Sequence, residues 1–184
     1  MESSGKKIKN ETYNLIKQTE KEYGVELSSI QKILCSLGPI GSPLSAIYGP
    51  LNLFVLKQDV RNSTEEETKL LGMDKDCEII YREVIVFKGG RPLFYALSLI
   101  PTGRINDTIK QALLDEKITI DKIIFDNNIE TIRDINSIVV EKPTPILKEL
   151  FKTSDDMLKR EYTISQHEKV WLWSREIFPL SYFK

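Results

Sequence analysis

The chain has 184 residues, 29% of them charged, and a formal net charge of −1 at pH 7. This length suits one domain with a buried core, so we expect residues 1–184 to form a single domain, with helices over 1–50 and a sheet core over 51–184. The near balance of charge, without a basic stripe, argues against nucleic acid as a partner, and no apolar run is long enough to span a membrane.

Few side chains could hold a metal or a cofactor. The two cysteines, Cys35 and Cys77, lack the spacing of metal ligands, and the one histidine, His167, lies in a polar run typical of a hairpin turn. We therefore expect no zinc site, no histidine-rich metal centre and no serine–histidine–aspartate triad. The N-terminus lacks the apolar core of a signal peptide, so the sequence predicts a cytoplasmic protein.

Two helices are predicted near the N-terminus. Residues 9–23 have the apolar spacing of an amphipathic helix, and Gly24 is placed to end it. A second helix follows at once, capped by Ser28 or Ser29 and ended by Leu37–Pro39.

A third, short helix is predicted between Gly41 and Gly49. Ser42 is placed to cap it and Pro43 to occupy its first position. This segment is either a flap over a site or a simple connector.

Strands dominate the rest of the chain, and turn and cap residues divide it into regular segments. The predicted elements are a strand over 51–60, a helix with a capping box from Ser63 to Glu66, a hairpin over 78–101 that turns at Gly89–Gly90, helices over 106–114 and 120–125, a strand over 129–140, a helix over 145–151 and a hairpin over 160–178. Tight hairpins join neighbouring strands in antiparallel order. The predicted fold class is therefore α+β, a mainly antiparallel sheet with helices packed on it.

Two charges interrupt apolar strand faces. Arg82 lies between Ile80 and Val84 at the strand period of two, and Glu176 breaks an apolar face near the C-terminus in the same way. A buried charge costs several kcal/mol unless it is paired or hydrogen-bonded. Either the two side chains pair with each other, or they hold a polar ligand between them.

The opposite strand faces carry Glu83, Arg175, Trp171 and Trp173. We interpret Glu83 and Arg175 as solvent-side groups or cross-strand partners. The two tryptophans are predicted to pack beneath a helix, and a homodimer contact is the alternative.

Segments along the sheet core resemble one protein family in their order and spacing. They are Leu70–Met73 with Ile80–Val84, Gly90–Leu93 with Ile100–Pro101, a weaker stretch over 118–135 that carries Arg133, and Arg160–Thr163 with Arg175–Pro179. This pattern resembles the chorismate pyruvate-lyase superfamily, and more closely its archaeal chorismate-lyase-like branch. That family shares its fold with the UTRA effector-binding domains of GntR-type repressors.

The resemblance implies an enzyme that converts chorismate to 4-hydroxybenzoate and pyruvate without a cofactor or metal. An arginine that corresponds to Arg82 binds the ring carboxylate in that family, and a glutamate that corresponds to Glu176 meets the 4-hydroxyl. In methanogen-type organisms the product would feed methanopterin synthesis. The alternatives are a non-catalytic binding protein of the UTRA type, for an aromatic or cyclic carboxylate, and a lyase or transferase for another cyclic acid.

The chain departs from the family at one position. A second family arginine, which helps to hold the enolpyruvyl carboxylate, corresponds here to Leu97. We expect Arg104 or Arg133 to supply the missing cation. The predicted site therefore has Arg82 and Glu176 as catalytic residues, with Arg104 and Arg133 as further substrate contacts.

Overall fold

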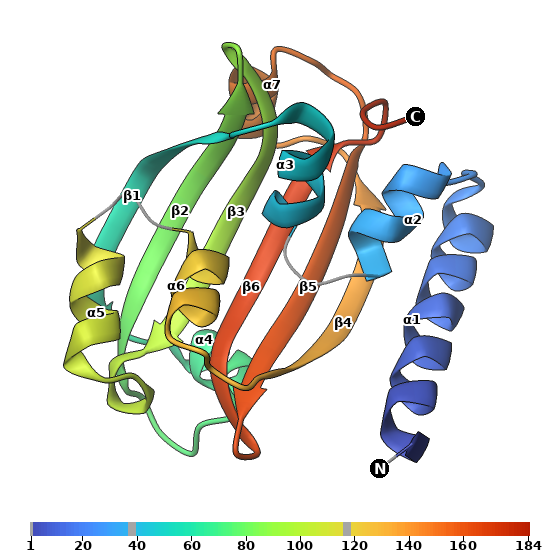
Figure 1. The fold of residues 1–184 in the computed structure, drawn as a ribbon. Coiled ribbons are helices and arrows are strands. Elements are labelled where there is room, and N and C mark those ends of the chain that lie inside the picture. Colours follow the sequence, from blue (N-terminus) through green and yellow to red (C-terminus); the bar gives the residue numbers. More distant parts are fainter. Residues whose placement is uncertain (1, 37–39, 116–118) are drawn as a thin grey trace.

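The computed structural model describes residues 2–36, 40–115 and 119–184. In this part of the chain six antiparallel strands form one sheet, in the order β1-β2-β3-β6-β5-β4 (Figure 1). The strands are β1 Asn52–Asn62, β2 Glu78–Lys88, β3 Arg91–Pro101, β4 Ile132–Glu141, β5 Met157–Gln166 and β6 Lys169–Pro179. The predicted α+β class with a mainly antiparallel sheet is confirmed.

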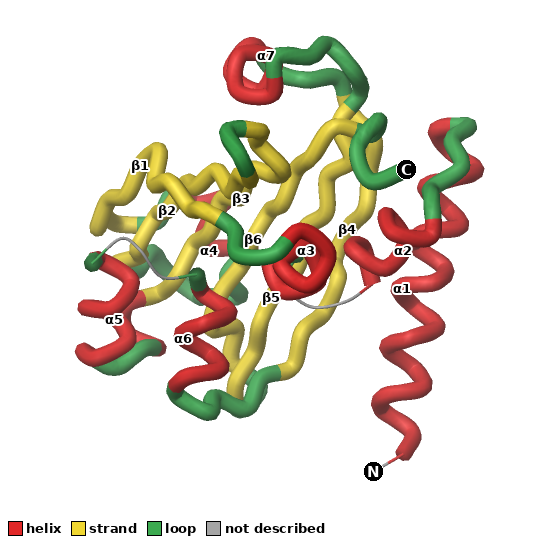
Figure 2. The backbone as a smooth tube through the Cα atoms, turned by 45° about the horizontal axis from the view of Figure 1, so that its top comes forward, coloured by secondary structure: helices red, strands yellow, loops and turns green. Residues whose placement is uncertain are grey.

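Helices pack on both faces of this sheet, most of them on one side. They are α1 Glu2–Tyr23, α2 Ser29–Ser36, α3 Gly41–Tyr48, α4 Glu65–Leu70, α5 Asp107–Leu114, α6 Ile120–Asp126 and α7 Pro145–Phe151, with a short 3-10 turn over Thr102–Arg104. Figure 2 shows α3, α5 and α6 on the same side of the sheet, with α1 and α2 beside β4. The first helix is longer than the predicted 9–23, and the predicted end of the second at Leu37–Pro39 lies outside the described residues.

We call the face that carries Arg82, Ser98, Ser174 and Glu176 the inner face. Its apolar residues pack against α1, α2 and α3 at one end and against α5 and α6 at the other. On the outer face, α7 covers Tyr95 and Ile177. The inner face therefore lies beneath a nearly continuous layer of helices, while the outer face is covered at its ends.

A bulge in the central hairpin decides which side chains of β3 lie on the inner face. Gly89 and Gly90 make the turn with φ values of 56° and 80°. The pairing shifts by one residue between Val86 and Phe87, so that Arg82 lies opposite Ser98. Without this shift Arg82 would face Leu97, which instead packs on the outer face.

A second bulge separates the two tryptophans that the alternation rule places on one face. The register of β5 and β6 shifts between Ile164 and Ser165, which leaves Trp171 as the extra residue of β6. Trp171 packs with the core beneath α5 and α6, and Trp173 packs on the outer face with Leu71. Both indoles are buried, but the prediction that they share a face is wrong.

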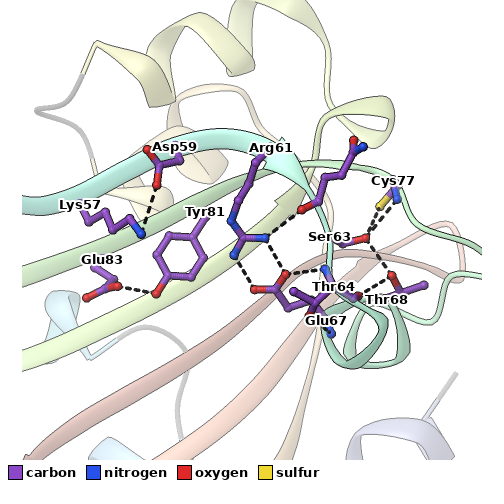
Figure 3. A network of polar contacts seen from close by, with 11 residues as sticks. Lys57, Asp59, Arg61, Ser63, Thr64, Glu67, Thr68, Cys77, Tyr81 and Glu83 are labelled. Atoms are coloured by element: carbon purple, nitrogen blue, oxygen red, sulfur yellow. Dashed lines mark hydrogen bonds and ion pairs between the residues drawn. The ribbon is translucent and has the colours of Figure 1, made fainter.

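The capping box of α4 lies one residue later than predicted. The Thr64 hydroxyl accepts from the Glu67 backbone N–H at 3.3 Å, and the Glu67 carboxylate accepts from the Thr64 N–H at 2.8 Å. Arg61 on β1 makes two hydrogen bonds of 2.7 Å to the same carboxylate (Figure 3). The predicted cap, Ser63, is buried and accepts from the Cys77 N–H instead, at 3.0 Å.

The start of α3 also differs from the prediction. The N-cap is Ile40, in helical conformation and without a side-chain cap, so Ser42 lies inside the helix rather than before it. Ile40 and Leu44 are fully buried, and this apolar contact fixes the helix where a polar cap was expected. The helix ends as predicted at Gly49, whose φ is 77°.

Candidate active site

A cavity of about 550 Å³ lies between the inner face of the sheet and helices α3 and α6. The sheet contributes mixed polar and apolar side chains, and the two helices contribute mainly small or polar ones. The lining residues are Arg82, Val84, Val86, Phe94, Ala96, Ser98, Tyr162, Ser174 and Glu176 from the sheet, Gly41, Ser42 and Ser45 from α3, Thr119, Ile120, Lys122, Phe125 and Asp126 from the α6 segment, and Leu51, Asn52 and Leu53. The volume suits one small organic molecule.

Strand register places the polar lining residues in two adjacent rows. In the first row Arg82 lies opposite Ser98, Ser98 opposite Ser174, and Ser174 opposite Tyr162. The two serine hydroxyls are 3.1 Å apart, and Ser174 donates to the backbone carbonyl of Leu97 at 3.1 Å. This row gives the cavity a hydroxyl-lined floor with a guanidinium at one end.

The second row holds a buried ion pair. Glu176 lies opposite Ala96 on β3 and opposite Arg160 on β5. The Nε and Nη2 atoms of Arg160 lie 2.7 Å and 2.5 Å from Oε2 of Glu176, and the Tyr162 hydroxyl donates to Oε1 at 3.1 Å. The two side chains are 0% and 5% exposed, so the pair is withdrawn from solvent.

Arg160 is held by further groups around the pair. Its Nη1 donates to the backbone carbonyl of Leu34 on α2 at 2.6 Å, and its guanidinium lies 5.0 Å from the centre of the Tyr162 ring. Burial opposes the charge of Arg160, but the Glu176 carboxylate raises the pKa of the guanidinium overall. The nearby Cys35 is a buried core thiol whose pKa burial raises to about 12.

Arg160 was not among the predicted site residues, although the sequence carries a signal for it. Leu158, Arg160, Tyr162 and Ile164 share one strand face at the period of two, so Arg160 interrupts an apolar row as Arg82 does. The structure thus gives Glu176 a permanent partner on the neighbouring strand.

The two residues singled out as catalytic both line the cavity. Arg82 is 2% exposed and Glu176 4%, and they come from β2 and β6, which β3 separates. Chain folding therefore brings together two charges that lie 94 positions apart in the sequence, as their numbers show.

The two predicted substitute cations lie elsewhere. Arg104 donates through Nη1 to the carbonyl of Leu71 at 3.1 Å and also to that of Val170. The Arg133 guanidinium lies 4.9 Å from the centre of the Tyr162 ring. Among the described residues that line the cavity, neither arginine is present, whereas Lys122 is.

Within residues 2–36, 40–115 and 119–184, no group of three His, Cys, Asp or Glu side chains is arranged to hold a metal ion. No helix in these ranges is both long enough and apolar enough to cross a membrane.

Sequence comparison identifies relatives of this chain. Residues 36–184 match the family model "Chorismate pyruvate-lyase Rv2949c-like". A protein of Methanocaldococcus jannaschii named "Putative lyase MJ0807" is 40% identical over 106 residues, which is 54% of this chain. The matched region spans 58% of that relative's length.

Two solved bacterial proteins have a similar fold. PhnF from Mycobacterium smegmatis superposes with a TM-score of 0.61 at 13% identity, covering 78% of this chain and 64% of its own. A GntR-family transcriptional regulator from Bacillus cereus superposes with a TM-score of 0.57 at 11% identity, and the match covers 73% of this chain and 94% of the regulator. At these identities the likeness concerns the fold alone.

Proposed function

Since this chain belongs to the Rv2949c-like chorismate pyruvate-lyase family, we propose that it is a lyase that converts chorismate to 4-hydroxybenzoate and pyruvate. The observation that carries the proposal is that Arg82 and Glu176 line one cavity of about 550 Å³. The cavity combines a buried cation, a carboxylate and an apolar wall. These three features match a ligand whose ring carries a carboxylate and a hydroxyl.

Arg82 would bind the ring carboxylate of the substrate. A guanidinium presents two parallel N–H donors that match the two carboxylate oxygens, which a lysine cannot reproduce. Arg82 is 2% exposed, so little water competes for this contact. The carboxylate would thereby fix the orientation of the ring.

Glu176 would act at the ring hydroxyl. The ether bond to the enolpyruvyl group breaks, the ring carbon that bears the hydroxyl loses its proton, and the leaving enolate is protonated to pyruvate. The ring becomes aromatic, so orientation and one proton transfer are sufficient. Because Arg160 and Tyr162 hold the carboxylate in place, Glu176 either accepts the proton or fixes the hydroxyl beside it.

The test is to incubate the purified protein with chorismate and follow pyruvate and 4-hydroxybenzoate together. We expect equal amounts of both products, and at least a hundredfold loss of rate in Arg82→Gln and Glu176→Gln, in the range that positioned acid–base groups contribute. Arg175→Gln and Glu161→Gln are controls of the same chemistry, because this pair joins β5 and β6 on the outer face, away from the cavity. The proposal fails if products form no faster than in protein-free buffer.

A non-catalytic binding protein for a cyclic carboxylate is the second candidate function. One observation favours it: the Glu176 carboxylate already has a guanidinium and a phenol as partners, as in a site that only binds. In that case calorimetry would detect binding of 4-hydroxybenzoate, weakened in Arg82→Gln, without turnover of chorismate.

A further inference from the structure

We propose that Lys122 on α6 supplies the cation for the second carboxylate of a dicarboxylate ligand, and that Asp126 holds this lysine when the ligand is absent. The inference rests on the proposed function and names a specificity residue for the same cavity. It replaces the predicted role of Arg104 and Arg133 with a residue that lines the cavity.

Besides Arg82, one cationic side chain of the cavity could bind a second carboxylate. Arg82 and Lys122 are the cationic residues among its described lining, on the sheet and on the helix across from it. The Arg160 guanidinium is occupied by Glu176 and the Leu34 carbonyl. Arg104 is engaged by two backbone carbonyls outside the cavity.

Position 97 cannot serve this purpose. The bulge in the central hairpin places Ser98 on the inner face, and Leu97 packs on the outer face with the core near α7 and Trp173. A long side chain at position 97 would extend away from the cavity. A second cation must therefore come from another element, and α6 is one of the two helices that line the cavity opposite the sheet.

Lys122 is anchored at its backbone and exposed at its end. Its N–H donates to the Thr119 hydroxyl at 3.2 Å, and the next residue, Ile123, is buried in the core. Its ammonium lies 2.8 Å from the Asp126 carboxylate, and the two side chains are 60% and 46% exposed. An exposed pair of this kind is weak because water screens it, so a ligand carboxylate can displace Asp126 at low cost.

This arrangement distinguishes substrate from product. Chorismate carries a ring carboxylate and an enolpyruvyl carboxylate, and 4-hydroxybenzoate keeps only the first. Lys122 would bind the substrate and then return to Asp126 when pyruvate leaves. The product would be held by Arg82 and Glu176 alone, which favours its release.

The test uses two stable probes that differ by one carboxylate. They are 3-(carboxymethoxy)benzoate and 3-methoxybenzoate, whose binding is measured by calorimetry. We expect Lys122→Met to weaken binding of the dicarboxylate about tenfold and to change the affinity for the monocarboxylate less than twofold. Asp126→Asn should strengthen binding of the dicarboxylate, because it releases the Lys122 ammonium. Lys110→Met is the control, since this lysine, on α5, pairs with Glu78 of β2 and is not among the lining residues.

The outcomes separate this inference from the proposed reaction. If Lys122→Met weakens both probes equally or neither, Lys122 has no part in recognising the second carboxylate, whether or not the protein is a lyase. If the dicarboxylate depends selectively on Lys122 but chorismate is not cleaved, the lyase proposal fails and the binding role stands. If wild-type protein does not bind the dicarboxylate probe, the Lys122 inference is overturned, and the chorismate assay alone decides the lyase proposal.

Discussion

Two ion pairs on β5 and β6 show how one residue step changes the role of a charge. Arg160 and Glu176 face the cavity with side chains 0% and 5% exposed. Glu161 and Arg175, one position along each strand, pair on the outer face and are 18% and 36% exposed. A buried pair is a poor source of net stability, but losing one partner leaves a charge without compensation. Only the inner pair is therefore expected to be sensitive to single substitutions.

We expect Arg160→Met to lower the free energy of unfolding by about 3–5 kcal/mol, because Glu176 is then left buried without its guanidinium. Arg175→Met should cost less than about 1 kcal/mol, because its pair is partly solvated. Urea unfolding of each variant would measure both changes in free energy. The double variant Arg160→Met with Glu176→Leu should recover most of the loss. Equal losses for Arg160→Met and Arg175→Met would contradict the assignment of the inner pair as the buried one.

At the scale of elements, one carboxylate joins the first two helices. Glu20 on α1 accepts from Lys17 at 2.9 Å, from Lys32 on α2 at 2.8 Å and from the Leu27 backbone N–H at 3.1 Å. The hydrogen bonds from Lys17 and Lys32 lower the pKa of Glu20 to about 2. The turn between α1 and α2 is therefore organised around an ionised side chain.

This link predicts a dependence of stability on pH. The pKa of Glu20 in the fold, about 2, lies below its ordinary value of 4.5, so its contribution is complete above pH 4.5 and is lost as the pH falls toward 2. Glu20→Gln should lower the unfolding free energy by about 1–2 kcal/mol at pH 7 and have little effect at pH 2. Glu149→Gln is the control, since its carboxylate is 77% exposed. A pH-independent effect of Glu20→Gln in thermal unfolding would count against this account.

At the scale of the whole molecule, the N-terminal helices close onto the C-terminus. The buried amide of Gln31 on α2 donates to the carbonyls of Leu180 and Tyr182 at 2.7 Å and 2.8 Å. The Ser28 hydroxyl donates to the carbonyl of Phe183 at 2.5 Å. In addition, Thr19 on α1 donates to the Ile138 carbonyl of β4 at 2.6 Å. We propose that residues 1–184 act as one folding unit.

Under that proposal, helix content and tryptophan fluorescence should report a single unfolding transition with one midpoint. Gln31→Leu should shift both signals together and lower the unfolding free energy by about 1–3 kcal/mol, because two carbonyls lose their buried donor. The side-chain amide of Gln111 on α5 donates to Asp115, an exposed residue directly after this helix, so Gln111→Leu should leave the midpoint unchanged. An early loss of helix signal, before the tryptophans respond, would mean that the N-terminal helices unfold separately.

Features that depend on neighbouring residues could be predicted from local sequence patterns. Turn glycines and the period of two placed the hairpin over 78–101, and the same alternation identified Arg82 and Glu176 as charges in apolar rows. Cap positions were less secure, since Ser63 and Thr64 are equally good cap residues and only packing chose Thr64. These local rules predict elements well and their exact ends less well.

Which elements meet depends on long-range packing and could not be predicted from local patterns. The pairing of β5 with β6 placed Arg160 opposite Glu176, and a one-residue bulge turned Leu97 away from the cavity. The packing of α6 across the sheet brought Lys122 to the same cavity. Strand order, bulges and helix placement are fixed by contacts between distant segments, whose combined burial outweighs local preference. The charged residues were therefore visible in the sequence, but their partners were not.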